Sequence, residues 1–129
     1  MSYQHLHQVT FEETDMAGIA HFSRYAQWVE QAEHAFLQQL GIAPISREGG
    51  FPKVHFNIDY QSPVRFGDIL SIELEVAEIG TSSINYEFSI LNKDRVSAAG
   101  KLTTAFVNQH GRSAPIPEEW KSLLANPSN

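Results

Sequence analysis

The stretch from Glu12 to Tyr25 gathers the residue types that can carry out chemistry. Asp15 supplies a carboxylate, Gly18 follows it within one turn, and His21 lies just before the start of a helical pattern. A carboxylate in such a place can act as a nucleophile or as a general base. Backbone N–H groups at a helix start are unpaired and favour developing negative charge. The alternative is that Asp15 is only a cap or turn residue, the commoner role of an aspartate before a helix.

Composition is that of an ordinary globular protein. The 129 residues, 42% hydrophobic and 19% charged, suit one domain covering residues 1–129. No apolar run approaches the roughly 18 residues of a membrane span, and no leader with a cleavage site is present, so we expect no membrane partner. The absence of cysteine excludes disulfides and a cysteine nucleophile, and it fits a reducing cytoplasm. We therefore expect a cytoplasmic protein.

Charge and histidine spacing argue against two further classes of partner. The net charge is −6, and the nine Lys and Arg residues are scattered singly, whereas nucleic-acid binding needs clustered cations. His5 and His7 would share one face of a strand and could hold a metal ion. Two ligands without a third nearby make a poor metal site. We expect no nucleic acid, no metal and no cofactor.

The longest helical pattern runs from Arg24 to Leu40. Ser23 is the expected N-cap, and Gly41 is the expected residue after the C-terminus. Glu33 falls on the apolar stripe, where an unpaired carboxylate would be costly. We expect Glu33 to reach an edge, a partner or a ligand. The predicted apolar stripe consists of Phe22, Ala26, Val29, Phe36 and Leu40.

The remaining sequence is typical of strands. Residues 3–11 alternate before the helix, residues 41–53 predict a loop, and four further strands follow. One long helix with about five strands favours an α+β domain, with the helix on one face of an antiparallel sheet. Uncovered sheet edges invite dimerisation by strand pairing. The four strands are predicted at 54–60, 69–78, 83–91 and 96–107, with a hairpin turn at 92–94 and a short helix at 118–124.

Four motifs in this order resemble the hotdog-fold acyl-CoA thioesterases, and most closely the 4-hydroxybenzoyl-CoA thioesterase type. The first motif is Asp15-Met16-Ala17-Gly18-Ile19, followed by Tyr25 and Glu30. The others are Pro63-Val64-Arg65-Phe66-Gly67-Asp68, the segment from Ala99 through Thr103 to Val107, and Pro115-Ile116-Pro117-Glu118.

The resemblance implies a hotdog fold, in which one long central helix is wrapped by a curved antiparallel sheet of about five strands. It also implies homodimers, often paired into homotetramers. The substrate would be an acyl-CoA, and the active site would lie at the dimer interface. The acyl-pantetheine arm would thread between subunits.

The resemblance also implies that Asp15 is the catalytic nucleophile or general base of thioester hydrolysis. By position, the amides near Arg24 and Tyr25 are the expected oxyanion donors. Gly18 allows the chain to turn tightly between the carboxylate and the helix. A thiolate leaves without a strong acid, so no further catalytic group is required.

Four further residues have supporting roles left open between alternatives. His21 either lines the thioester site or packs at the helix entry. Glu30 either braces the site or pairs with a neighbouring subunit, and it is the reserve candidate for the catalyst in place of Asp15. Arg65 and Lys101 are the candidates for binding CoA phosphates, because the turn at residues 80–83 carries no basic residue.

Two other functions remain open at this point. A hotdog hydratase or dehydratase would pair His21 with Glu30 or Glu33, a spacing that fits poorly. A non-catalytic acyl-CoA-binding dimer would use the same fold without turnover, because fold does not fix function. In each case, the expected acyl lining is Trp28, Phe51, Phe56 and Tyr60.

Overall fold

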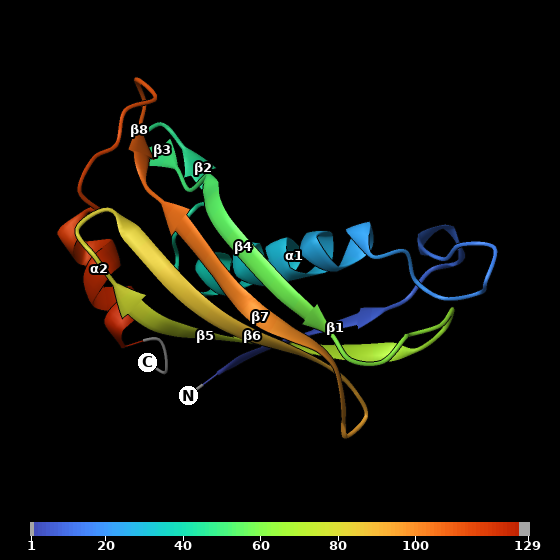
Figure 1. Cartoon of the computed structure of the whole chain (residues 1–129). Coiled ribbons are helices and arrows are strands. Elements are labelled where there is room, and N and C mark those ends of the chain that lie inside the picture. Colours follow the sequence, from blue (N-terminus) through green and yellow to red (C-terminus); the bar gives the residue numbers. More distant parts are fainter. Residues whose placement is uncertain (1, 127–129) are drawn as a thin grey trace.

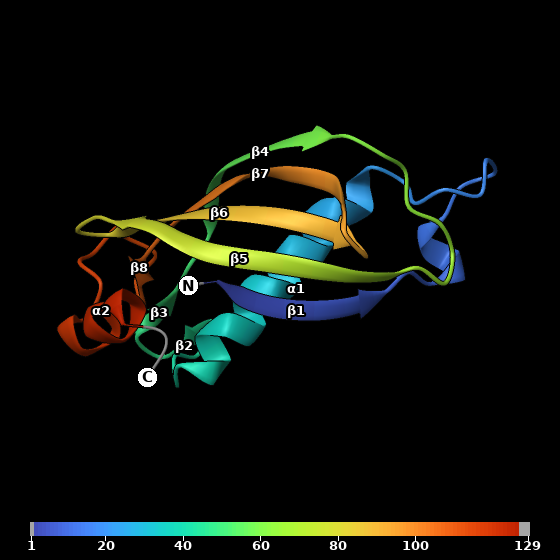
Figure 2. The ribbon, with the colours of Figure 1, turned by 90° about the horizontal axis from the view of Figure 1, so that it is seen from below.

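Alternating apolar residues build the main sheet, as the period-two pattern predicts. A computed structural model describes residues 2–126 of the chain. Its five-stranded antiparallel sheet has the order β1-β5-β6-β7-β4, and the strands curve around α1 (Figures 1 and 2). The strands are β1 (Tyr3–Gln8), β4 (Lys53–Tyr60), β5 (Ile69–Ile79), β6 (Ser83–Asn92) and β7 (Arg95–Ala105), and the helix α1 spans Ser23–Gln39.

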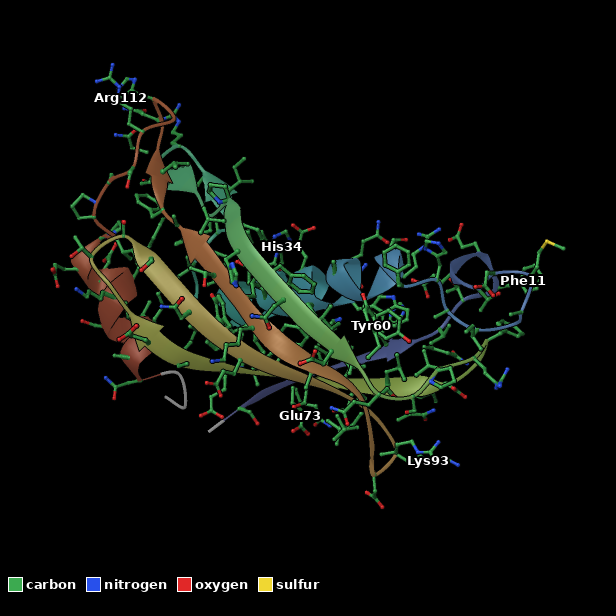
Figure 3. The ribbon with its side chains drawn as sticks, viewed as in Figure 1. Phe11, His34, Tyr60, Glu73, Lys93 and Arg112 are labelled. Carbon is green, nitrogen blue, oxygen red and sulfur yellow. The ribbon has the colours of Figure 1, made fainter. Side chains whose placement is uncertain are left out.

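The two faces of the sheet differ in polarity. On β5, Leu70, Ile72 and Leu74 are buried beneath α1. The intervening Glu73 lies on the outer face, and Figure 3 shows its side chain on the side of the sheet away from α1. Burying apolar side chains stabilises by about 25 cal/mol per Å². The concave face therefore holds the core, and the helix lies against it.

The helix lies close to its predicted position and buries Val29 and Phe36 as predicted, but the rest of its buried face differs. Its N-cap is Phe22 rather than Ser23, and no side chain caps the first turn. Phe22 and Ala26, both predicted to be buried, are exposed, and Phe22 has 65% of its surface accessible. The buried face instead consists of Tyr25, Trp28, Val29, Ala32, Glu33, Phe36 and Leu37.

Three boundaries differ from the prediction because tertiary contacts interrupt the local pattern. The first strand ends at Gln8, and a short 3-10 helix, η1 (Phe11–Glu13), replaces its predicted end. The predicted loop at 41–53 contains β2 (Ile45–Ser46) and β3 (Gly49–Gly50). β3 pairs with both β2 and β8 (Val107–Asn108) in a small three-stranded sheet, and β8 follows β7 as a separate strand.

The described residues form two α-helices. The expected central helix, α1, has 17 residues, and α2 (Glu118–Ala125) packs against β5 near the C-terminal end. The prediction of one long central helix is therefore met only in its coarser form, a helix lying on a five-stranded antiparallel sheet. Within residues 2–126, neither helix is both long and apolar enough to cross a membrane.

Glu33 finds its partner at the start of β4. It is fully buried, with 0% of its surface exposed. Its Oε1 lies 2.6 Å from Lys53 Nζ, which also lies 3.3 Å from Glu30 Oε2. The contact is an ion pair whose angles do not meet those of a hydrogen bond, and neither Glu33 oxygen accepts one. Burial raises the pKa of Glu33, and Lys53 partly opposes that rise.

Replacing Lys53 by methionine is expected to lower the free energy of unfolding by about 3 kcal/mol at pH 7, because it leaves Glu33 as an uncompensated buried charge. The loss should shrink at pH 5. Burial raises the pKa of Glu33, so folding favours its protonated form, and the penalty falls as the carboxyl takes up a proton. Urea unfolding at the two pH values measures both effects.

Glu30→Gln is the matched control, because it removes the exposed partner of the same lysine. It should change the free energy of unfolding by less than about 1 kcal/mol. An equal loss at pH 7 and pH 5 in Lys53→Met would contradict the ion-pair explanation.

Candidate functional site

Asp15 begins a tight turn between η1 and α1. Its amide donates to the Ile19 carbonyl at 2.9 Å, and the Gly18 amide donates to the Asp15 carbonyl at 2.9 Å. Oδ1 accepts the Ala17 N–H at 2.8 Å, so one oxygen acts as a turn acceptor. Gly18 has a φ of +79°, which side chains rarely adopt. Asp15 is exposed, and within residues 2–126 Oδ2 has no hydrogen-bond partner.

Glu13 lies directly beneath this turn and is buried, with 7% of its surface exposed. Its Oε1 accepts the Thr10 N–H at 2.9 Å and lies 2.9 Å from His7 Nε2. Its Oε2 accepts the Trp28 Nε1–H at 2.8 Å. One carboxylate therefore joins β1, the start of η1 and α1.

The hydrogen bonds keep Glu13 ionised. Burial by itself raises the pKa of Glu13, but donors from Trp28, Thr10 and His7 outweigh it and lower the pKa to about 2. An ionised carboxylate can only accept hydrogen bonds. His7 must therefore carry a proton on Nε2, a tautomer assigned from its partner.

The start of α1 leaves one amide free. His21 Nδ1 accepts the Ser23 N–H at 3.3 Å and lies 2.7 Å from Ser23 Oγ. The Arg24 amide donates to the His21 carbonyl at 3.0 Å, so it is occupied. The Tyr25 amide donates to the Phe22 carbonyl at 3.4 Å. In the described part of the chain, the Phe22 amide makes no hydrogen bond and is the unpaired donor.

Tyr60 fixes the Phe22 peptide from the end of β4. Its hydroxyl donates to the Phe22 carbonyl at 3.2 Å, and its ring packs edge-on against Tyr25 with centroids 4.9 Å apart. Figure 3 shows Tyr60 beside the N-terminal end of α1. Burial raises the pKa of Tyr25, so its phenol stays neutral. The Tyr25 side chain packs the helix start rather than facing solvent.

The structure brings some of the predicted site residues to Asp15 and places others elsewhere. Arg65 lies beside the Asp15 turn, because an isolated antiparallel bridge joins Ile19 to Arg65. Glu30 lies about two helical turns into α1, where it pairs with Lys53. Lys101 lines a groove on the outer face of the sheet, together with carboxylates of β5 and β6. Of the two predicted phosphate ligands, only Arg65 therefore adjoins the Asp15 turn.

A groove of about 700 Å³ flanks α1 between β4 and the small sheet. Glu30, His34 and Lys53 are among its polar lining residues, and Phe51 is among its apolar ones. Trp28, also predicted to line the acyl site, is instead fully buried against Glu13. Across residues 2–126, no group of three or more His, Asp or Glu side chains is arranged to hold a metal ion.

Sequence reasoning missed Glu13 and the Phe22 amide. The spacing Thr10-x-x-Glu13 is a capping-box pattern, and it could have identified Glu13. No local sequence signal identifies the Phe22 amide. Whether this amide is hydrogen-bonded depends on the conformation of His21 at the helix start. Tyr60 was expected to line the acyl site, and its hydrogen bond to the Phe22 carbonyl was not foreseen.

Comparison with known proteins matches residues 9–124 to the model of the thioesterase-like superfamily. A 1,4-dihydroxy-2-naphthoyl-CoA hydrolase from Synechococcus elongatus is 29% identical, over 96% of this chain and 98% of that protein. One from Synechococcus sp. (strain CC9311) is 33% identical, over 85% and 80%. The structure of BH1999 gentisyl-coenzyme A thioesterase superposes with a TM-score of 0.87 at 28% identity, covering 94% of this chain and 98% of that one.

The five-stranded antiparallel sheet around α1 and the likeness to a CoA thioesterase structure define the class of hotdog-fold thioesterases. The chain belongs to the thioesterase-like superfamily, and by class it is a thioester hydrolase.

Glu13 should control part of the acid unfolding of the protein. Its folded pKa of about 2 lies below the ordinary value of 4.5, so its contribution to stability is present above pH 4.5 and is lost as the pH falls toward 2. Glu13→Gln should therefore reduce the slope of the free energy of unfolding against pH across that window. The largest reduction is the slope that one proton contributes, about 1.4 kcal/mol per pH unit. Urea unfolding between pH 5 and pH 2.5 measures the slope.

Glu12→Gln is the control, because Glu12 is an exposed neighbour with the same charge. Its slope should match that of the wild type. The hypothesis fails if Glu13→Gln and the wild type lose stability in parallel over this range.

Proposed function

We propose that the chain hydrolyses acyl-CoA thioesters to free acid and CoA, with Asp15 as nucleophile or general base. The observation that carries this proposal is the exposed Asp15 carboxylate, with Oδ2 unpaired, close in sequence to the free Phe22 amide at the helix start. As a base, Asp15 would take a proton from water while the oxygen adds to the thioester carbonyl. Collapse of the tetrahedral intermediate breaks the C–S bond and releases the thiolate.

The Phe22 amide is the proposed oxyanion donor. It replaces the amides of Arg24 and Tyr25, which already donate to carbonyls within the first turn. A free amide at a helix start combines a direct hydrogen bond with the positive end of the helix dipole. Tyr60 supports this role, because its hydrogen bond to the Phe22 carbonyl limits rotation of that residue.

The acyl group is proposed to be a hydroxylated aromatic acid. Relatives are named for 1,4-dihydroxy-2-naphthoyl-CoA and gentisyl-CoA, and both names describe hydroxylated aromatic acyl groups. The groove beside α1 has the volume of a small-molecule site. Its mixture of Phe51 with Glu30 and His34 suits an aromatic ring that carries hydroxyl groups. Arg65 is the proposed contact for a CoA phosphate.

We further propose that this single domain works as a homodimer or a dimer of dimers in the cytoplasm, with its active site at the subunit interface. β1 and β4 form the two edges of the main sheet, and such edges favour pairing with another strand. Phe11, Met16 and Phe22 are exposed around the Asp15 turn. A second subunit would cover these apolar side chains and exclude water from the thioester.

The hydratase alternative fits the observed contacts less well. It needs a histidine paired with a helix carboxylate. His21 Nδ1 is engaged by Ser23, Glu30 pairs with Lys53, and Glu33 is buried against the same lysine. A non-catalytic acyl-CoA-binding dimer would bind the thioester without releasing a thiol.

Asp15→Asn is expected to lower kcat for aromatic acyl-CoA hydrolysis by at least about 10²-fold, because asparagine cannot act as a base. The melting temperature should hardly change, since the amide oxygen can still accept the Ala17 N–H. Release of free CoA with a thiol reagent measures the rate, using benzoyl-, gentisyl- and short aliphatic acyl-CoA.

Asp59→Asn, an exposed carboxylate on the outer face of the sheet, is the matched control and should retain the wild-type rate. Unchanged hydrolysis by Asp15→Asn would rule out the proposed mechanism. Hydration of an enoyl thioester by the wild type, without thiol release, would favour the hydratase instead.

A further inference from the structure

Glu13 contacts three elements that border the Asp15 turn. Its side chain holds β1 through His7, the start of η1 through Thr10, and α1 through Trp28. Its backbone carbonyl accepts the His21 N–H at 2.9 Å. The side chain and main chain of one residue therefore fix both the strand side and the helix side of the turn.

The two ends of the segment carrying Asp15 meet at Glu13. The next residue, Thr14, pairs with Ala20 in an isolated antiparallel bridge. Ala20 in turn donates its amide to the Val64 carbonyl at 2.8 Å. Residues 14–20 thus form a short closed loop. Its base is held by Glu13 on one side and by the buried Ala20, bonded to Val64, on the other. Asp15 follows Glu13 with only Thr14 between them, so a shift of the Glu13 backbone would be transmitted directly to Asp15.

We propose that Glu13 is a positioning residue for thioester hydrolysis, whose buried carboxylate holds the Asp15 turn in the orientation that the reaction requires. The proposal rests on the function proposed for Asp15. Glu13 itself touches no substrate. It acts by holding the turn in place, and a displacement of about 1 Å can cost about 10²-fold in rate.

The site requires a carboxylate rather than an amide of the same shape. Three donors converge on the two oxygens of Glu13, and an ionised carboxylate accepts all of them. Glutamine could place its NH₂ group at the Oε2 position, where it would oppose the Trp28 N–H. In the other orientation the NH₂ group would oppose both the Thr10 N–H and the His7 Nε2–H. Glu13→Gln therefore keeps the volume but releases one of the anchored elements.

The first test is the steady-state kinetics of Glu13→Gln with an aromatic acyl-CoA. We expect kcat to fall about 10²-fold. KM, and the Kd of a non-hydrolysable thioether analogue, should stay within about 2-fold of the wild-type values, because binding surfaces are unchanged. In an Asp15→Asn background, Glu13→Gln should lower the residual rate by less than about 3-fold, because its effect passes through Asp15.

Two variants control for folding and charge. His7→Phe keeps an aromatic ring against Trp28, with which His7 packs at 5.2 Å between centroids, but it removes one donor to Glu13. It should lower kcat about 10-fold without changing KM. Glu12→Gln removes the same charge from an exposed neighbour and should leave both constants unchanged. Active-site concentration is taken from the folded fraction measured by circular dichroism.

The outcomes separate this inference from the function on which it rests. Full activity in Asp15→Asn would overturn the proposed function. An inactive Asp15→Asn together with wild-type kcat in folded Glu13→Gln and His7→Phe would overturn only the role of Glu13. A loss that multiplies fully with that of Asp15→Asn would also overturn it, because the effect would then be independent of the aspartate.

Discussion

A buried anion must be supplied with donors, and this requirement organises the region before α1. An unpaired carboxylate in the interior costs several kcal/mol. Glu13 escapes that cost only when His7 of β1, the Thr10 amide and Trp28 of α1 stand around it together. The short segment above it is also held by the Ile19–Arg65 bridge and by the Ala20 amide on the Val64 carbonyl. The hydrogen bonds that surround Glu13 place the strand side and the helix side of that segment.

A second buried carboxylate, Glu33, connects the same helix to the opposite edge of the sheet. Glu33 meets Lys53 at the start of β4, whereas Glu13 connects α1 to β1. These are the two edge strands of the main sheet. Apolar packing against the central strands gives most of the stabilisation but specifies position weakly, because hydrophobic contacts are not directional. Charged contacts at the two edges add direction, which fixes how the helix lies across the sheet.

The sequence predicts the repeating parts of the structure well, because they depend on local periodicity. The four later strands and α1 lie within a few residues of their predicted positions. The buried face of α1 was predicted only in part, because Phe22 precedes the helix and Trp28 is drawn inward by Glu13, fifteen residues earlier. The partner of Glu33 lies twenty residues away and could not be assigned from the helix alone. Asp15 was proposed from its motif and stays a prediction, whereas the free Phe22 amide depends on the conformation of His21, which no sequence pattern encodes.

The proposed chemistry requires few catalytic groups to be held in position. A thiolate leaves without protonation by a strong acid, so a carboxylate and one oxyanion donor suffice. In the proposed mechanism, residues 15 and 22 would supply both from one short segment, and the buried network beneath would hold that segment. Under the same proposal, selection among acyl groups would fall to separate surfaces, such as the groove beside Glu30 and His34. Changes in that groove can alter the substrate while the Asp15 turn stays the same, which fits a superfamily whose members are named for different aromatic acyl groups.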